Sequence, residues 1–288
     1  MVKAKQIGRI AVIAMAIPLM SFAEDGGHDK AVRLNDEGVK LVQKGDIKSA
    51  INNFKAAIDA DVHYVESAHN LGKLLIAAKQ YALAEKILTY VTRENPNDMG
   101  SYVQLAQATA LQGKKDACVA AIEKIAKGDK TMLTSLALLL SGQNTQEVAE
   151  YAAKRAVEEE PGNAEAWYNQ GLIAQRAKKW QESEKSYGKA VELKPDYVNA
   201  LVNLGNVQDA QGKTDAAIAS YEKAYAANAE SSLALYNLGR MLTMKGKDPK
   251  RGLELLQAAT RHGTEPAANA ARELLNYLVA QTKKGGAK

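Results

Sequence analysis

The chain has 288 residues, of which 46% are apolar, so it is long enough to bury a substantial core. Its formal net charge is +5, but three of its 38 basic residues (Lys3, Lys5 and Arg9) lie within the first ten positions, which leaves 35 basic against 33 acidic residues. This balance argues against the strongly basic surface typical of nucleic-acid-binding proteins. The single cysteine, Cys118, excludes an intramolecular disulfide.

The first 23 residues have the pattern of a secretory signal peptide. A basic start precedes the apolar run 10–20, which is too short to span a bilayer as a helix. Small residues at Ser21 and Ala23 predict cleavage before Glu24. We expect a bacterial protein that is periplasmic and not inserted in a membrane after cleavage. An uncleaved anchor is the alternative.

Glycines recur along the chain at an interval of 34 residues. Gly38 and Gly72 form one pair, and Gly171, Gly205 and Gly239 form a run of three. Alanines continue the series between them, with a single shorter step of 31 residues. The segments between the recurring turn residues have the apolar periodicity of helices and no strand-like alternation. This repetition predicts an all-α solenoid, in which each unit packs on its neighbours.

The repeated pattern resembles the tetratricopeptide repeat, or TPR, whose motif runs W-x2-L-G-x2-Y, then A-x3-F-x2-A, then P. The copy at 164–197 matches best, with Trp167, Gly171, Tyr187 and Pro195 in the motif positions. The resemblance implies a right-handed superhelical solenoid of about seven helix-turn-helix repeats. We place these repeats at 31–64, 65–98, 99–129, 130–163, 164–197, 198–231 and 232–266.

The ends of the chain complete this organisation. Residues 24–30 are predicted to be a flexible N-terminus, and 285–288 a disordered tail. Between the last repeat and the tail, 267–284 predicts an amphipathic helix that covers the open end of the stack. Its apolar stripe consists of Ala271, Leu274, Leu275 and Leu278.

Two kinds of residue have predicted local roles in the repeats. The missing side chain of Gly205 should let the two helices of its repeat approach closely. Asn163 and Asp196 each follow a proline shortly before the next repeat, and each is predicted to cap the helix that follows.

Nothing in the sequence indicates catalysis, a metal or a cofactor. The four histidines, His28, His63, His69 and His262, do not have the spacing of metal ligands. Cys118 occupies a repeat position that requires a small buried residue, and we interpret it as packing. Trp167 and Trp180 are interpreted in the same way, because other repeats have apolar residues at their positions. We therefore predict that the chain is not an enzyme.

Asparagines stand in a repeated position that the resemblance associates with binding. They directly precede the Leu–Gly or Gln–Gly pair of four repeats and are Asn70, Asn169, Asn203 and Asn237. They resemble the asparagine ladder of some TPR proteins, whose amides bind the backbone of a peptide in the groove, because an amide both donates and accepts hydrogen bonds. The alternative is that these amides bond to neighbouring repeats or to water.

Further residues are predicted to line the groove from the periodicity of the first helix of each repeat. They are Tyr168, Leu172, Asn206, Tyr236 and Arg240. The carboxylate clamp of co-chaperone TPR domains is not predicted, because only Asn203 matches its pattern in the three best repeats.

The resemblance implies a scaffold that binds a protein or peptide partner, and the leader places this function in assembly of the bacterial envelope. Two alternatives remain: a chaperone-like assembly factor for a pilus, secretion or outer-membrane complex, and an accessory regulator or tether of a peptidoglycan or polysaccharide enzyme complex. A groove or open end of this kind also allows self-association.

Overall fold

The computed structural model describes residues 26–142, 144–261 and 266–285, and the predicted signal peptide lies outside them. The described residues form fifteen α-helices and no strands, which confirms the all-α prediction. The helices are α1 (Gly27–Lys44), α2 (Ile47–Ala60), α3 (Val65–Ala77), α4 (Tyr81–Glu94), α5 (Met99–Leu111), α6 (Lys115–Gly128), α7 (Met132–Leu139), α8 (Gln146–Glu159), α9 (Ala164–Arg176), α10 (Trp180–Leu193), α11 (Val198–Ala210), α12 (Thr214–Ala227), α13 (Ser232–Met244), α14 (Pro249–Ala259) and α15 (Pro266–Gly285).

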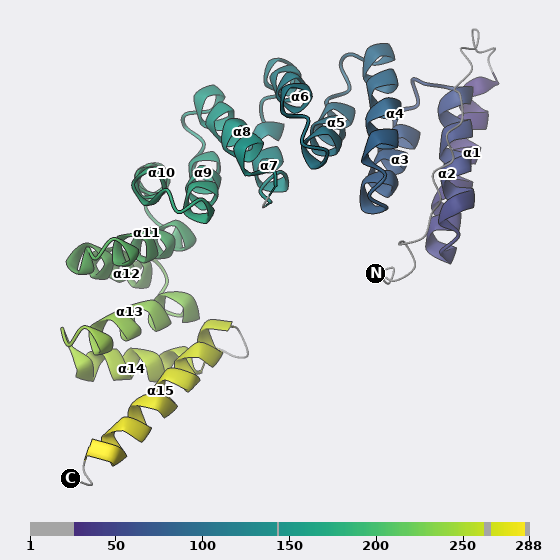
Figure 1. The fold of residues 1–288 in the computed structure, drawn as a ribbon. Coiled ribbons are helices and arrows are strands. Elements are labelled where there is room, and N and C mark those ends of the chain that lie inside the picture. The colour runs from purple at the N-terminus through teal and green to yellow at the C-terminus, as the bar shows by residue number, and fades with distance from the viewer. Residues whose placement is uncertain (1–25, 143, 262–265, 286–288) are drawn as a thin grey trace. The chain divides into compact units, whose positions relative to one another are not determined.

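The helices belong to two compact units, which divide between Glu159 and Glu160. The first unit contains α1–α8 and the second contains α9–α15. Within each unit, consecutive helices pack in pairs, beginning with α1 on α2 and with α9 on α10 (Figure 1). Each pair falls within the residues of one repeat as placed from the sequence, apart from the start of α1. The repeated sequence thus corresponds to a repeated helical hairpin.

The start of α1 differs from the prediction of a flexible N-terminus at 24–30. The helix begins at Gly27. Nδ1 of His28 lies 2.8 Å from Oδ2 of Asp61, and its ring contacts the edge of Tyr64 with ring centroids 5.4 Å apart. Both partners lie between α2 and α3. The first turn is therefore held by residues more than 30 positions away, which a local reading of the sequence does not reveal.

Close approach of two helices explains the repeated glycines, as predicted for Gly205. A Cβ atom at three of these positions would collide with a buried ring on the second helix of the same repeat. The pairs are Gly38 with Phe54 (2.6 Å), Gly171 with Tyr187 (2.6 Å) and Gly205 with Tyr221 (2.5 Å). All three rings are fully buried. The glycines thus allow each ring to fill the space between its two helices.

Several turns between paired helices contain a residue with a left-handed backbone. Gly45, Gly113 and Gly212 adopt it with φ values of 82°, 73° and 75°. Two other turns place a lysine in the same conformation, with φ of 59° at Lys79 and 58° at Lys178. These lysines are strained, because a side chain disfavours the left-handed region.

Of the two predicted helix caps, one is confirmed and one is wrong. The side chain of Asn163 accepts hydrogen bonds from the backbone N–H groups of Glu165 (3.0 Å) and Ala166 (3.2 Å) at the start of α9. Asp196 does not cap α11, because that helix begins at Val198, the same repeat position as Ala164 in α9, and Tyr197 therefore occupies the N-cap position. The carboxylate is thus one residue too early.

The last helix covers the end of the second unit. Ala268 and Ala271 of α15 are fully buried, and Leu274, Leu275 and Leu278 pack against the core that α13 and α14 help to form. This is the predicted capping role. Among the described residues, no helix has the length and apolar character needed to cross a membrane.

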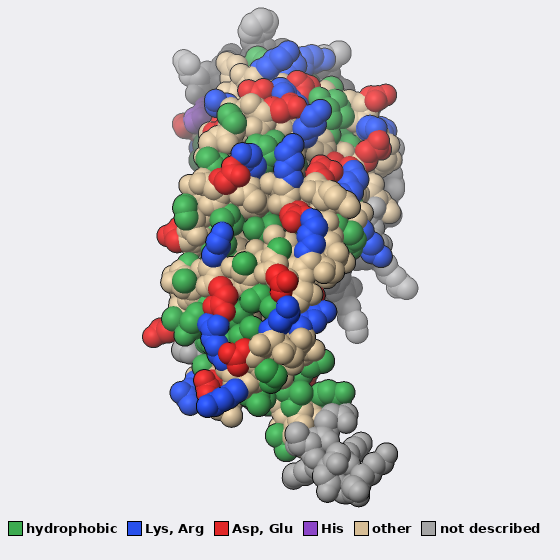
Figure 2. All heavy atoms as spheres, turned by 90° about the vertical axis from the view of Figure 1, so that its left-hand side faces the viewer, with side chains coloured by type: hydrophobic (Ala, Val, Ile, Leu, Met, Phe, Trp, Pro, Cys, Tyr) green, Lys and Arg blue, Asp and Glu red, His purple; other side chains and the backbone are tan. Residues whose placement is uncertain are grey.

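Charged side chains connect successive repeats. Glu184 on α10 accepts hydrogen bonds from Gln211 (2.8 Å) and Lys213 (2.6 Å) of the following repeat. On the face shown in Figure 2, acidic and basic side chains are interspersed and do not gather into one region of a single sign.

Candidate functional site

Six of the predicted groove residues lie on the first helices of three successive repeats in the second unit, at spacings of three or four residues that put each pair on one face of its helix. We call this the α9–α11–α13 face, and it consists of Tyr168, Leu172, Asn203, Asn206, Tyr236 and Arg240. All six side chains are half-buried. They are therefore held by their neighbours and still reach solvent.

A chain of hydrogen bonds runs along this face. The amide nitrogen of Asn203 donates to the hydroxyl of Tyr168 (3.3 Å), and that of Asn206 donates to the side-chain oxygen of Asn203 (3.4 Å). The hydroxyl of Tyr221 in turn donates to the side-chain oxygen of Asn206 (2.8 Å). Burial raises the pKa of Tyr221 to about 12, so its hydroxyl keeps its proton at neutral pH. These bonds fix the orientation of both amides.

An ion pair continues the face toward α13. Nη2 of Arg240 lies 3.2 Å from Oδ2 of Asp209 on α11, and Nζ of Lys245 lies 3.7 Å from the other carboxylate oxygen. The guanidinium charge of Arg240 is therefore compensated within the unit. This pair couples the sixth and seventh repeats at the face.

Aromatic rings gather at the α9 end of the face. The ring of Tyr168 lies against those of Tyr197 and Tyr187, with centroids 5.0 and 5.7 Å away. Nζ of Lys194 lies 5.1 Å from the centroid of Tyr197, within the range of a cation–π contact. Burial raises the pKa of both Tyr168 and Tyr197. The cluster combines apolar ring faces with hydroxyl groups that remain protonated at neutral pH, a combination common in protein interfaces.

The four asparagines of the predicted ladder lie in two different environments. Asn169 and Asn237 are buried, with 4% and 6% of their surface exposed. The amide of Asn237 donates to the carbonyl of Leu233 in its own helix (2.8 Å). Asn70 and Asn203 are half-buried, and each donates to the preceding repeat. The four asparagines therefore do not form a row of free amides. Asn70, Asn203 and Asn237 each donate a hydrogen bond within the protein, and these bonds compensate the cost of burying a polar group.

A similar hydrogen bond to the preceding repeat is made by the residue that stands two positions before the recurring glycine or alanine. Asn70 donates to the side-chain oxygen of Asn35 (2.9 Å), and Gln104 donates to the carbonyl of His69 (3.2 Å). Like the bond from Asn203 to Tyr168, each spans 35 residues. The interval of 34 residues from Asn70 could have identified Gln104. No comparable signal identified Asn35.

The other residues considered for chemistry have structural surroundings. Nε1 of Trp167 donates to the carbonyl of Pro161 (2.8 Å) in the turn before α9. Cys118 is fully buried, and burial raises the pKa of its thiol to about 11. In the part of the chain that the structure describes, no three His, Cys, Asp or Glu residues are grouped to hold a metal ion. His262 lies outside that part.

Comparison with known families identifies the repeat. Three family models, each described as a tetratricopeptide repeat, match residues 41–110, 163–230 and 202–261. Together they cover more than half of the chain. No curated protein sequence matches it.

Solved structures resemble the chain in fold. Yeast Tom70 aligns over 89% of this chain and 55% of its own, with 16% identity and a TM-score of 0.50. The human IFIT1 dimer with m7Gppp-AAAA aligns over 89% and 65%, with 16% identity and a TM-score of 0.52. A crystal structure of MamA protein aligns over 71% and 94%, with 20% identity and a TM-score of 0.42. At these identities the likeness concerns the fold alone.

Proposed function

Because the chain belongs to the tetratricopeptide repeat family, we propose that it is a non-enzymatic scaffold that binds a protein or peptide segment on the α9–α11–α13 face. The observation that carries the proposal is the continuous hydrogen-bonded row from Tyr168 through Asn203 and Asn206 to Tyr221. Side chains held in place before binding lose little conformational entropy when a partner arrives.

The chemistry of the face suits a protein segment better than a small polar metabolite. The Tyr168 and Tyr197 rings offer apolar surface, and Asn203 and Asn206 lie beside them with their amides already oriented. Arg240 is neutralised by Asp209, so the face does not select strongly for an anion. A mixture of aromatic and uncharged polar groups is typical of protein interfaces.

We further propose that the protein acts outside the cytoplasm, in assembly of a bacterial envelope. The support is the leader at residues 1–23, a pattern in the sequence. N-terminal sequencing of the protein purified from its native cell tests this proposal, and the mature chain should begin at Glu24. A chain in the membrane fraction that retains Met1 would contradict it.

The binding face is tested by affinity purification from the native envelope, followed by titration of the captured partner. Tyr168→Ala combined with Asn203→Ala should weaken partner binding at least tenfold, as expected for residues central to an interface. The matched control is Asn70→Ala, which removes the equivalent inter-repeat hydrogen bond in the first unit and should leave the affinity unchanged.

Circular dichroism of both variants checks that the helices remain folded. If the double variant is folded and binds the partner as tightly as the original chain, the α9–α11–α13 face is not the binding site. If Asn70→Ala weakens binding as much as the double variant, binding is not confined to that face.

A further inference from the structure

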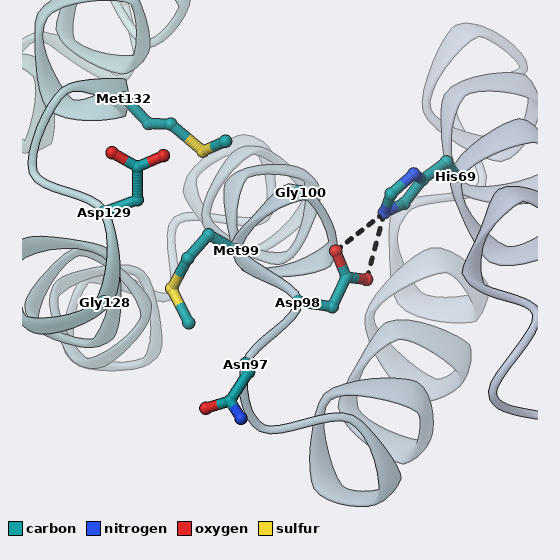
Figure 3. Close-up of a pocket in the computed structure, with 8 residues that line it drawn as sticks. All are labelled: His69, Asn97, Asp98, Met99, Gly100, Gly128, Asp129 and Met132. Atoms are coloured by element: carbon teal, nitrogen blue, oxygen red, sulfur yellow. Dashed lines mark hydrogen bonds and ion pairs between the residues drawn. The ribbon is translucent and has the colours of Figure 1, made fainter.

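A pocket of about 530 Å³ opens in the first unit, where the boundaries of three successive repeats meet. Its wall includes His69 from α3, Asp98 and Met99 at the start of α5, Gly128 and Asp129 at the end of α6, and Met132 at the start of α7 (Figure 3). The volume lies within the range of small-ligand sites. It can accommodate one long side chain from a partner.

Two glycines allow the walls of this pocket to form. A Cβ atom on Gly100 would lie 2.8 Å from both Cε1 and Nε2 of His69, so the imidazole rests directly against the start of α5. A Cβ atom on Gly128 would collide with the sulfur of Met99. The positions of the imidazole and the thioether therefore depend on the absence of side chains at these two residues.

One of the two carboxylates in the pocket already has a partner. Nε2 of His69 lies 3.1 and 3.0 Å from the two carboxylate oxygens of Asp98 (Figure 3). Burial alone would raise the pKa of Asp98, but hydrogen bonds from His69 and Ser101 and the electrostatic effect of His69 together outweigh it and lower the pKa. The side chain of Asp98 is 13% exposed. It is thus held as an anion within its own pair.

The other carboxylate, Asp129, has no cation beside it. One of its oxygens accepts hydrogen bonds from the backbone N–H (3.1 Å) and hydroxyl (2.6 Å) of Thr131. Nζ of the adjacent Lys130 is directed elsewhere, to the carbonyl of Glu159 (3.4 Å). Among the residues that the structure describes, no Lys, Arg or His forms an ion pair with Asp129. The pocket therefore has an uncompensated negative charge.

The methionines give the same wall an apolar surface. In Figure 3 the carboxylate of Asp129 lies on the side of the pocket that carries Met99 and Met132, away from the His69–Asp98 pair. Methionine side chains are flexible and adapt to the shape of an apolar ligand. A lysine or arginine side chain has an apolar stem and a charged end, and such stems commonly lie along apolar surface.

We propose that this pocket binds a basic side chain, lysine or arginine, of a protein partner. The stem of that side chain lies along Met99 and Met132, and its charge pairs with Asp129. This inference rests on the proposed protein-binding function in one respect: the basic side chain is assumed to belong to a protein. Its site is in the first unit, separate from the residues of the α9–α11–α13 face.

Methionine-methyl NMR of the full chain tests the proposal. Met99 and Met132 report on the pocket, and Met241 and Met244 on α13 are internal references. The capped tripeptide Ac-Ala-Lys-Ala-NH2 should shift the Met99 and Met132 resonances in a saturable manner and leave the references in place. The analogue with norleucine, which keeps the stem and lacks the charge, should bind at least tenfold more weakly, and the analogue with glutamate should cause no shift.

The matched variant is Asp129→Asn, which removes the charge and retains an oxygen that can accept from Thr131. It should lose the lysine-dependent shifts while the reference resonances stay unchanged. Equal binding of the norleucine and lysine peptides, or full shifts in the Asn variant, would overturn the proposal. The two proposals can fail separately. If partner binding depends on Tyr168 and Asn203 but lysine causes no shift, the assignment of this pocket is overturned and the proposed function stands.

Discussion

Gly205 and Tyr221 occupy one space between α11 and α12: a Cβ atom on the glycine would lie 2.5 Å from Cε1 of the ring. Tyr221 is fully buried, and its hydroxyl reaches Asn206 on the α9–α11–α13 face. The glycine therefore serves two purposes. It lets the helices pack, and it lets the hydroxyl of a buried tyrosine reach and orient Asn206 of the candidate site.

Gly205→Leu should reduce the free energy of unfolding by about 1–3 kcal/mol, because the new side chain overpacks the contact with Tyr221. Urea unfolding followed by circular dichroism measures the change. The matched control is Gly188→Ala in α10, where nothing lies within 4 Å of the added Cβ. That change should stabilise the protein by about 0.5–1 kcal/mol through helix propensity. A neutral effect of Gly205→Leu would mean that the two helices can separate without cost.

Lys178→Gly should stabilise the second unit by about 0.5–1 kcal/mol. Lys178 has φ of 58°, which costs a residue with a side chain about 1–2 kcal/mol, and the greater freedom of glycine in the unfolded chain offsets part of the gain. Thermal unfolding measures the difference. The reverse change at the equivalent turn, Gly212→Lys, should destabilise by a similar amount. Destabilisation by Lys178→Gly would show that contacts of the lysine side chain outweigh its backbone strain.

Asn163→Ala should destabilise the protein by about 1 kcal/mol, because it leaves two backbone N–H groups at the start of α9 without their side-chain acceptor. Asp196→Ala is the informative comparison. Asp196 also follows a proline, but Tyr197 holds the N-cap position of α11, so this change should have little effect. Denaturant unfolding of the two variants in parallel measures both values. Equal losses would mean that Asp196 contributes to α11 in another way.

The hydrogen bonds between His69 and Asp98 should make the stability of the protein sensitive to acid. The pKa of Asp98 lies below its ordinary value of 3.8 in the folded protein, so the carboxylate contributes stability that is present above about pH 4. That contribution is lost as the pH falls through the folded-state pKa. The difference in unfolding free energy between the original chain and Asp98→Asn should therefore be largest near neutral pH and shrink below pH 4. A constant difference across this range would contradict the assignment.

Much of the candidate site could be anticipated from the spacing of residues, because position within a repeat decides which way a side chain points. This is why Tyr168, Asn203 and Asn206 lie together on one face. Spacing could not show that Asn237 would donate to its own helix while Asn203 donates to the preceding repeat. That choice depends on the acceptors within reach of each amide. The pocket beside Asp129 could not be predicted from spacing either, because four helices from three repeats contribute to it.

The sequence by itself determined the repeat, the helical class and the packing role of Gly205, because each follows from a residue's own size or from periodicity along the chain. Only the tertiary structure decided the start of α1 at Gly27, the hydrogen bonds of Asn70 and Asn203 to the preceding repeat and the pairing of His69 with Asp98. Each of these depends on a partner about 30 residues away. Such contacts follow from how one repeat rests on the next, and a sequence pattern does not specify that packing residue by residue.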